Sequence, residues 1–180
     1  MIDDELGTVE RAGDHSVLRY RRHLAHPPEL VWRALTEDEH LAAWFPTTIE
    51  GRRAAGAPLH FSFREGEGEP FDGEMLAFDP PSLMELRWAD DVLRFEVEPE
   101  GSGCILRLSV TFPDHGKAAR DAAGWHVSLE RLTHALDGTL PPWQPPERWR
   151  VVHRAYVERL GPEASVIGPP EEWERVHGDR

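Results

Sequence analysis

Apolar and polar side chains alternate with a period of two through most of residues 47–114. Leu59, Phe61 and Phe63 show the pattern first, with polar neighbours between them. Comparable runs follow, and turn sequences rich in glycine, proline or aspartate separate them. Such alternation is typical of strands that have one buried and one solvated face. We therefore predict an antiparallel meander here, and one earlier strand over residues 16–25, where the same period occurs.

Helical spacing replaces this alternation in other parts of the chain. Residues 29–45 predict two short helices that end before Pro46. From Lys117 to Leu136 the apolar residues recur at intervals of four and three, which predicts a long amphipathic helix. A further helix is expected over residues 147–160, with an apolar stripe formed by Trp149, Val152, Tyr156 and Leu160. This stripe should be buried, either on its own domain or across a homodimer.

Gly124 lies inside the predicted long helix. A glycine in a helix interior costs about 1 kcal/mol relative to alanine, so its presence calls for a packing reason. We expect that Gly124 allows something to pack closely against the helix.

The order of these elements indicates an α+β fold. A strand, two short helices and a run of strands precede the long helix, whose apolar stripe has to be buried against the sheet. We predict an antiparallel sheet of about six or seven strands wrapped around this C-terminal helix. The domain should span residues 16–138. Residues 1–15 are expected to be a flexible acidic end, and residues 139–180 an extension with the helix at 147–160 and a polar tail.

Composition narrows the classes of function. The formal net charge of −13 argues against binding nucleic acid, because that needs a basic patch to meet the phosphates. No apolar run is long enough for a membrane span, and the acidic N-terminus has no apolar core of a secretory signal. The single cysteine, Cys104, excludes an internal disulfide and is typical of a reducing compartment. We therefore expect a cytoplasmic protein.

Three stretches of the sequence resemble a known superfamily. The run LRYRRHLAHPPELVWRALTEDEHLAAWF resembles the opening of the SRPBCC superfamily, which has the START-like (helix-grip, Bet-v-1-like) fold. FDGEMLAFDPPSLMELRW resembles a strand pair of the branch named for the activator of the heat-shock-protein-90 ATPase, and GWHVSLERLTHALDG resembles its C-terminal helix. The resemblance covers about residues 16–138. It implies a helix-grip fold around an internal cavity, which members often use for lipids, polyketides or other apolar small molecules.

Large apolar and aromatic side chains occupy many of the predicted inward positions. A single helix rarely fills the whole concavity of a sheet, so some of these residues should line a pocket, as the resemblance also implies. The candidate ligand-binding residues are Trp44, Phe61, Phe63, Met75, Met84, Leu86, Trp88, Phe95, Trp125, His126 and Leu129. We expect Phe61, Met84, Trp88 and Trp125 to line a cavity and His126 to lie at its polar edge.

Signals for catalysis and for metal binding are weaker. His126 is the one candidate for acid–base chemistry, because histidine titrates near neutral pH. The ten histidines show no metal-ligand motif, so neither a metal nor another cofactor is expected. Lys117 is the only lysine, and its place at the start of the long helix predicts that it is solvated. Outward-facing pairs such as Glu85 and Arg94 predict cross-strand ion pairs.

The sequence favours a binding protein over an enzyme. We predict that an apolar or aromatic small molecule, similar to a lipid or polyketide, binds in a cavity between the sheet and the long helix. Two alternatives stay open: a cyclase or dehydratase that uses His126 as acid and base, and a co-chaperone-like module that binds a protein. A convergent set of polar groups in the cavity would favour the enzyme. A large exposed apolar patch would favour a protein partner.

Overall fold

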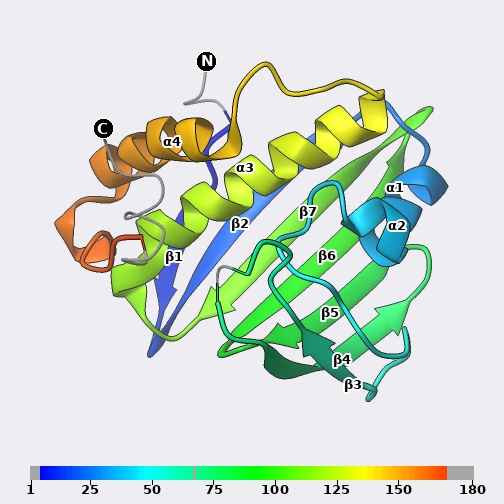
Figure 1. The fold of residues 1–180 in the computed structure, drawn as a ribbon, viewed down its shortest axis with the longest axis horizontal. Coiled ribbons are helices and arrows are strands. Elements are labelled where there is room, and N and C mark those ends of the chain that lie inside the picture. The colour runs from blue at the N-terminus through cyan, green and yellow to red at the C-terminus, as the bar shows by residue number, and fades with distance from the viewer. Residues whose placement is uncertain (1–4, 67, 170–180) are drawn as a thin grey trace.

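The computed structural model describes residues 5–66 and 68–169, and it has the predicted α+β helix-grip fold (Figure 1). One antiparallel sheet of seven strands has the order β1-β2-β7-β6-β5-β4-β3. The strands are β1 (Thr8–Ala12), β2 (His15–Leu24), β3 (Pro58–Phe61), β4 (Phe71–Asp79), β5 (Leu83–Trp88), β6 (Asp91–Glu100) and β7 (Gly103–Phe112). The α-helices of the described residues are α1 (Pro28–Thr36), α2 (Asp38–Leu41), α3 (Ala118–Asp137) and α4 (Pro145–Leu160).

The meander predicted from the period-two pattern forms the continuous part of the sheet. Each of the strands β3 to β6 pairs with the next strand along the chain. The early strand β2 then adds to the far side of β7, where Tyr20 lies opposite Leu108. This pairing brings the first and last strands of the predicted domain together, because β7 leads directly into α3 and α3 must return across the same sheet (Figure 1).

The long helix α3 buries one stripe against the sheet. Its buried apolar side chains include Ala118, Ala122, Trp125, Leu129 and Leu132. A short 3-10 turn, η2 (His115–Lys117), precedes it, and there the Asp114 carboxylate accepts a hydrogen bond of 2.9 Å from the Gly116 backbone N–H. Gly138 ends α3 in the left-handed conformation, with φ of 69°, as expected of a C-terminal glycine.

The N-terminal segment differs from the sequence-based expectation. Residues 1–15 were expected to form a flexible end, but Thr8–Ala12 is the edge strand β1, paired with β2 from Thr8 opposite Arg19 to Ala12 opposite His15. Most of β1 is exposed on both faces. A strand with two solvated faces needs no apolar alternation, so its sequence lacks the pattern that revealed the other strands.

The C-terminal extension contains the expected helix. The helix α4 begins at Pro145, two residues before the expected start, and it packs beside α3 of its own chain (Figure 1). Val152 and Tyr156 are fully buried, whereas Trp149 and Leu160 are partly buried. A second 3-10 turn, η3 (Pro162–Ala164), follows it. The rest of the expected polar tail, residues 170–180, lies outside the described residues.

Charged side chains cover the outward face of the sheet. The guanidinium of Arg87 lies 2.8 Å from the Glu74 carboxylate, and that of Arg94 lies 3.0 Å from Glu85, so cross-strand ion pairs form as predicted. Along the part of the chain that the structure covers, no helix combines the length and the apolar character that a membrane crossing requires.

The prediction that Lys117 is solvated is wrong. Its ammonium Nζ lies 2.7 Å and 2.9 Å from the two carboxylate oxygens of Asp91 and 3.2 Å from Asp121, and only 16% of the side chain is exposed. Periodicity placed Lys117 at the helix start, but it gave no information about Asp91, which the tight turn between β5 and β6 brings beneath the helix.

Candidate ligand-binding site

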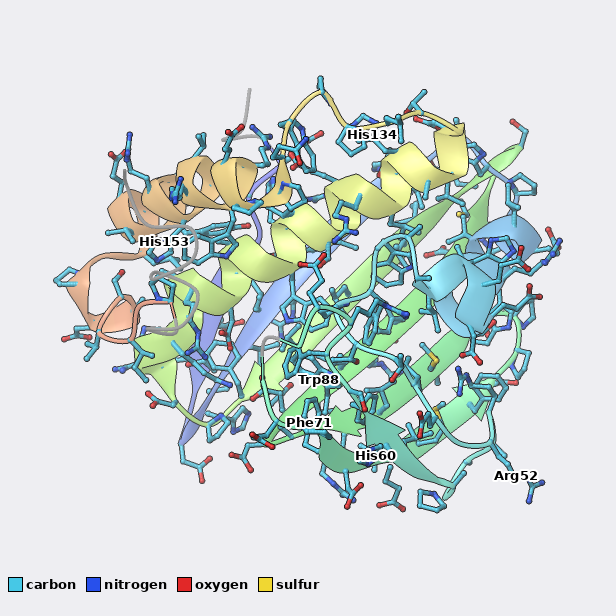
Figure 2. All side chains as sticks on the ribbon, in the orientation of Figure 1. Arg52, His60, Phe71, Trp88, His134 and His153 are labelled. Atoms are coloured by element: carbon cyan, nitrogen blue, oxygen red, sulfur yellow. The ribbon has the colours of Figure 1, made fainter. Side chains whose placement is uncertain are left out.

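Aromatic side chains form a cluster between the sheet and α3. Trp88 of β5 is central, because its ring centroid lies 5.2 Å from those of Phe71 on β4 and Trp125 on α3. Figure 2 shows Trp88 and Phe71 in front of the sheet. Phe45, in the loop after α2, contacts Trp125 at 5.7 Å and Trp88 at 6.4 Å. We call Phe45, Phe63, Phe71, Trp88 and Trp125 the aromatic cluster.

The structure brings most of the predicted site residues to the same layer. Those buried there are Trp44, Phe61, Met75, Met84, Leu86, Phe95, Trp125 and Leu129. Phe63 and Trp88 are partly buried. The aromatic members pack against one another edge to face or tilted, as Trp44 does against Phe95 at 6.0 Å. These residues therefore form part of the hydrophobic core. Their role in lining an internal cavity stays a prediction.

A surface groove opens beside the aromatic cluster. Its volume is about 340 Å³. The loop after α2, the loop after β3, one face of α3 and the start of α4 form its walls. Its lining residues include Ala42, Phe45, Pro46, Arg64, Glu65, Gly124, Val127, Ser128, Arg131, Pro145, Pro146 and Trp149. Phe45 contributes both to this groove and to the aromatic cluster, so the groove lies directly against the packed rings.

Gly124 lies in this groove without any close neighbour. A Cβ atom built on it would meet no heavy atom within 4 Å, apart from its own helix. The sequence-based expectation that something packs closely here therefore finds no partner in the described protein. The groove beside Gly124 is the space that the missing side chain leaves open.

Two arginines, Arg64 and Arg131, line the groove and bring positive charge to it. The Arg64 Nε donates a hydrogen bond of 3.0 Å to the carbonyl oxygen of Phe45. Burial lowers the pKa of Arg64, and the nearby charge of Arg131 lowers it further, against the opposing effect of Asp38. Within residues 5–66 and 68–169, neither Arg64 nor Arg131 forms an ion pair with a carboxylate, although most other strand and helix arginines do. Their guanidinium groups remain available to an anion.

His126 and Trp125, although adjacent on α3, have different neighbours. Its ring is fully buried and faces away from the aromatic cluster, with ring centroids 6.3 Å from Tyr20 and 5.9 Å from Tyr156. Consecutive residues of an α-helix point about 100° apart, and Trp125 contacts the aromatic cluster while His126 contacts the two tyrosines. That His126 lies at the polar edge of a cavity lined by Trp125 therefore stays a prediction.

The groove residues Arg64 and Arg131 were not recognised from the sequence. They stand 67 positions apart, one in a turn and one on the polar side of α3, and no local pattern links them. Glycine at position 124 was the one signal that pointed to this face.

The fold and groove define a helix-grip α+β protein, in which a long C-terminal helix lies across an antiparallel sheet. The chain belongs to the family described as Activator of Hsp90 ATPase homolog 1-like protein, whose model matches residues 25–137. This match confirms the resemblance seen in the sequence. A search among curated proteins gives no match.

Solved structures show the same fold at low identity. A conserved protein of unknown function, EF2215 from Enterococcus faecalis, has a TM-score of 0.72 at 19% identity and covers 86% of this chain and 90% of its own. CalU16 from Micromonospora echinospora has a TM-score of 0.67 at 20% identity, covering 84% and 92%. Protein MLL2253 from Mesorhizobium loti has a TM-score of 0.58 at 27% identity, covering 69% and 99%. Identities of about 20% establish the fold alone.

Proposed function

We propose that the protein binds a small organic molecule with an apolar or aromatic body and an anionic group in the groove beside Gly124. The observation that carries this proposal is the open space at Gly124 itself. A glycine inside a helix lowers stability by about 1 kcal/mol relative to alanine, and no protein atom uses the space that results. A ligand that packs against the bare helix backbone explains this cost.

The dimensions and chemistry of the groove support the proposal. Its volume of about 340 Å³ lies within the range of small-molecule sites, which is roughly 300–1,000 Å³. Phe45, Val127 and Trp149 offer apolar surface, and Ser128 adds a hydroxyl. Arg64 and Arg131 would meet a carboxylate or sulfonate, because guanidinium groups bind such anions through paired hydrogen bonds. Glu65 also lines the groove, so the anionic group should lie toward the two arginines.

Two fluorescent probes with the same aromatic body test the proposal. One is 1-anilinonaphthalene-8-sulfonate, and the other is N-phenyl-1-naphthylamine, which lacks the sulfonate. We expect the folded protein to bind both probes. Replacing both arginines (Arg64→Gln with Arg131→Gln) should weaken binding of the sulfonate about tenfold or more and leave the neutral probe nearly unchanged, since a charge-assisted hydrogen bond contributes roughly 1.5–3 kcal/mol.

Substitutions at Gly124 provide the matched pair of variants. Gly124→Leu should remove binding of both probes because the side chain fills the groove, while the melting temperature is kept or raised by the better helix propensity. Gly124→Ala adds only one methyl group and should preserve most of the affinity. If Gly124→Leu binds both probes as the unchanged protein does, the groove is not the binding site and the proposal fails.

The two alternative functions receive less support from this geometry. His126, the acid–base candidate of a cyclase or dehydratase, faces the tyrosines instead of the groove. The exposed large apolar residues are Leu76, Leu140, Val151 and Val166, and they come from different segments of the described chain. A protein-docking patch would gather such residues on one surface. Binding of a small molecule is therefore the function that we favour.

A further inference from the structure

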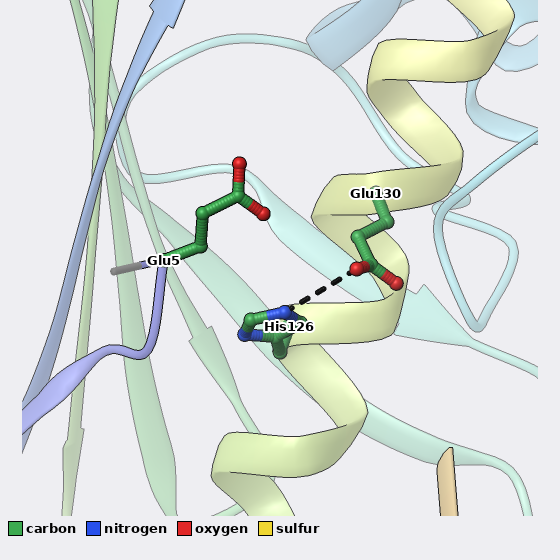
Figure 3. A group of neighbouring side chains, drawn as sticks. All are labelled: Glu5, His126 and Glu130. Atoms are coloured by element: carbon green, nitrogen blue, oxygen red, sulfur yellow. Dashed lines mark ion pairs between the residues drawn. The ribbon is translucent and has the colours of Figure 1, made fainter. Parts of the chain in front are cut away.

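A second cluster of chemically active side chains lies behind α3, away from the groove. It consists of Glu5, just before β1, and of His126 and Glu130, which are four residues apart on α3. One ligand-type atom from each residue lies within 4.8 Å of the other two. Figure 3 shows the carboxylates of Glu5 and Glu130 approaching the same side of the His126 ring. His126 is fully buried, Glu130 is mostly buried and Glu5 is exposed.

The hydrogen bonds around His126 determine which ring nitrogen carries a proton. Tyr20 donates its single hydroxyl proton to the carbonyl oxygen of Ala122, which can only accept. Tyr156 donates its hydroxyl proton to the Tyr20 oxygen at 3.3 Å and accepts the Gly7 backbone N–H at 2.8 Å. With the Tyr156 proton directed at Tyr20, the Nδ1 of His126, 3.2 Å from the Tyr156 oxygen, is the donor of that contact.

This assignment leaves the other ring nitrogen, Nε2, with a lone pair that has no hydrogen-bond partner. Nε2 lies 3.4 Å from Oε1 of Glu130 but makes no hydrogen bond with any described residue, and it is completely buried. In a neutral ring, its lone pair would face carboxylate oxygens across a dry space. A buried polar atom without a partner costs about 1–3 kcal/mol. A cation between Nε2 and the carboxylates would remove this cost.

We propose that Glu5, His126 and Glu130 form a binding site for a divalent transition-metal ion of the zinc type. Imidazole nitrogen with two carboxylates suits such an ion better than calcium or magnesium, which prefer oxygen ligands alone. This site is independent of the groove beside Gly124 and of the small-molecule binding proposed there.

The distances suit tetrahedral coordination. Two ligand atoms that each lie about 2.1 Å from a tetrahedral zinc ion are about 3.4 Å apart. The separation of 3.4 Å between His126 Nε2 and Glu130 Oε1 has this value. Glu5 is exposed on a separate segment, so its carboxylate can complete the triad by side-chain rotation. Three protein ligands leave the fourth position to water, as in zinc sites that remain open to exogenous ligands.

The surrounding residues act as an outer shell of the site. The Tyr156 oxygen accepts the His126 Nδ1–H, which fixes the ring orientation, as is usual for metal-bound histidines. Arg148 of α4 donates hydrogen bonds to both oxygens of Glu130, including one of 2.9 Å to Oε2. A carboxylate has about four lone-pair positions, so Glu130 can accept Arg148 and bind a cation at once.

Glu130 is ionised, as a ligand must be. Burial raises its pKa, but the hydrogen bonds from Arg148 oppose burial and hold the pKa below its usual range. The positive charge of Arg148 reduces the attraction for a dication, so we expect a moderate affinity, in the micromolar range, rather than that of a closed structural zinc site.

Calorimetric titration of the chelator-treated full chain with zinc chloride tests the site. We expect one zinc ion per chain and a melting temperature that rises with zinc concentration. Glu5→Gln removes an exposed ligand without disturbing the core, so it should weaken zinc binding at least tenfold and abolish the rise. His126→Gln should do the same, with the fold of each variant checked by circular dichroism.

His153→Gln is the matched control. Nε2 of His153 is also buried without a hydrogen-bond partner in the described chain, but this residue lies outside the cluster. The control should bind zinc as the unchanged protein does. The proposal is overturned if the unchanged protein takes up no zinc, or if Glu5→Gln and His126→Gln bind it with unaltered affinity.

Discussion

At the scale of single residues, His153 links stability to pH. It lies on α4 against α3 (Figure 2) and stacks on Trp149 with a centroid distance of 4.4 Å. Burial lowers its pKa below the ordinary value of 6.5, and its buried Nε2 has no hydrogen-bond partner among the described residues. The unfolded chain therefore binds a proton more readily than the folded protein does as pH falls through this range.

We predict from this sign that His153 reduces stability at acidic pH. Above the pKa of His153 in the unfolded chain, about 6.5, this effect on the free energy of unfolding is absent. The destabilisation grows as the pH falls below that value. Denaturant unfolding at pH 7.5 and at pH 5 measures this destabilisation when the unchanged protein is compared with His153→Gln. The unchanged protein should lose more free energy of unfolding than the variant. Equal losses in the two proteins would show that the pKa of His153 is the same in the folded and unfolded states.

At the scale of elements, Tyr156 joins α4 to three other parts of the fold. Its buried hydroxyl accepts the Gly7 backbone N–H before β1 and contacts Tyr20 of β2 and His126 of α3. Tyr156→Phe should therefore cost about 1–3 kcal/mol, because a buried donor loses its acceptor. Denaturant unfolding in zinc-free buffer measures the loss. Val151→Ala, on the exposed side of α4, is the control and should stay within about 0.5 kcal/mol. A loss as small for Tyr156→Phe would contradict this role.

The sequence revealed elements best where one of their faces is buried. Leu59, Phe61 and the later alternating runs predicted the meander because each strand has one dry face. The edge strand β1 was missed because both of its faces are solvated. The same limit applies to the sites: the stripe that contains Trp125 could be read from spacing, whereas the partners of His126 come from β2 and α4, whose packing against α3 is not encoded in any local period.

At the scale of the whole molecule, the two ends of the chain support one structure. The segment before β1 and the helix α4 meet behind α3, while the aromatic cluster fills the other side of the same helix. We therefore predict cooperative unfolding of the domain and its extension together. Melting curves from tryptophan fluorescence, to which both the aromatic cluster and Trp149 of α4 contribute, and from far-ultraviolet circular dichroism should coincide. An early transition seen by only one method would mean that α4 detaches first.

The ion pair of Lys117 with Asp91 and Asp121 has a consequence for covalent chemistry. Acylation, reductive methylation and most amine-directed cross-linking need an uncharged, accessible lysine. Asp121 and Asp91 outweigh the effect of burial and raise the pKa of this single lysine, whose side chain is mostly covered. Reagents and enzymes that modify lysine therefore find almost no reactive side chain here while the protein is folded. Labelling of Lys117 would report unfolding of the β5–β6 turn away from the start of α3.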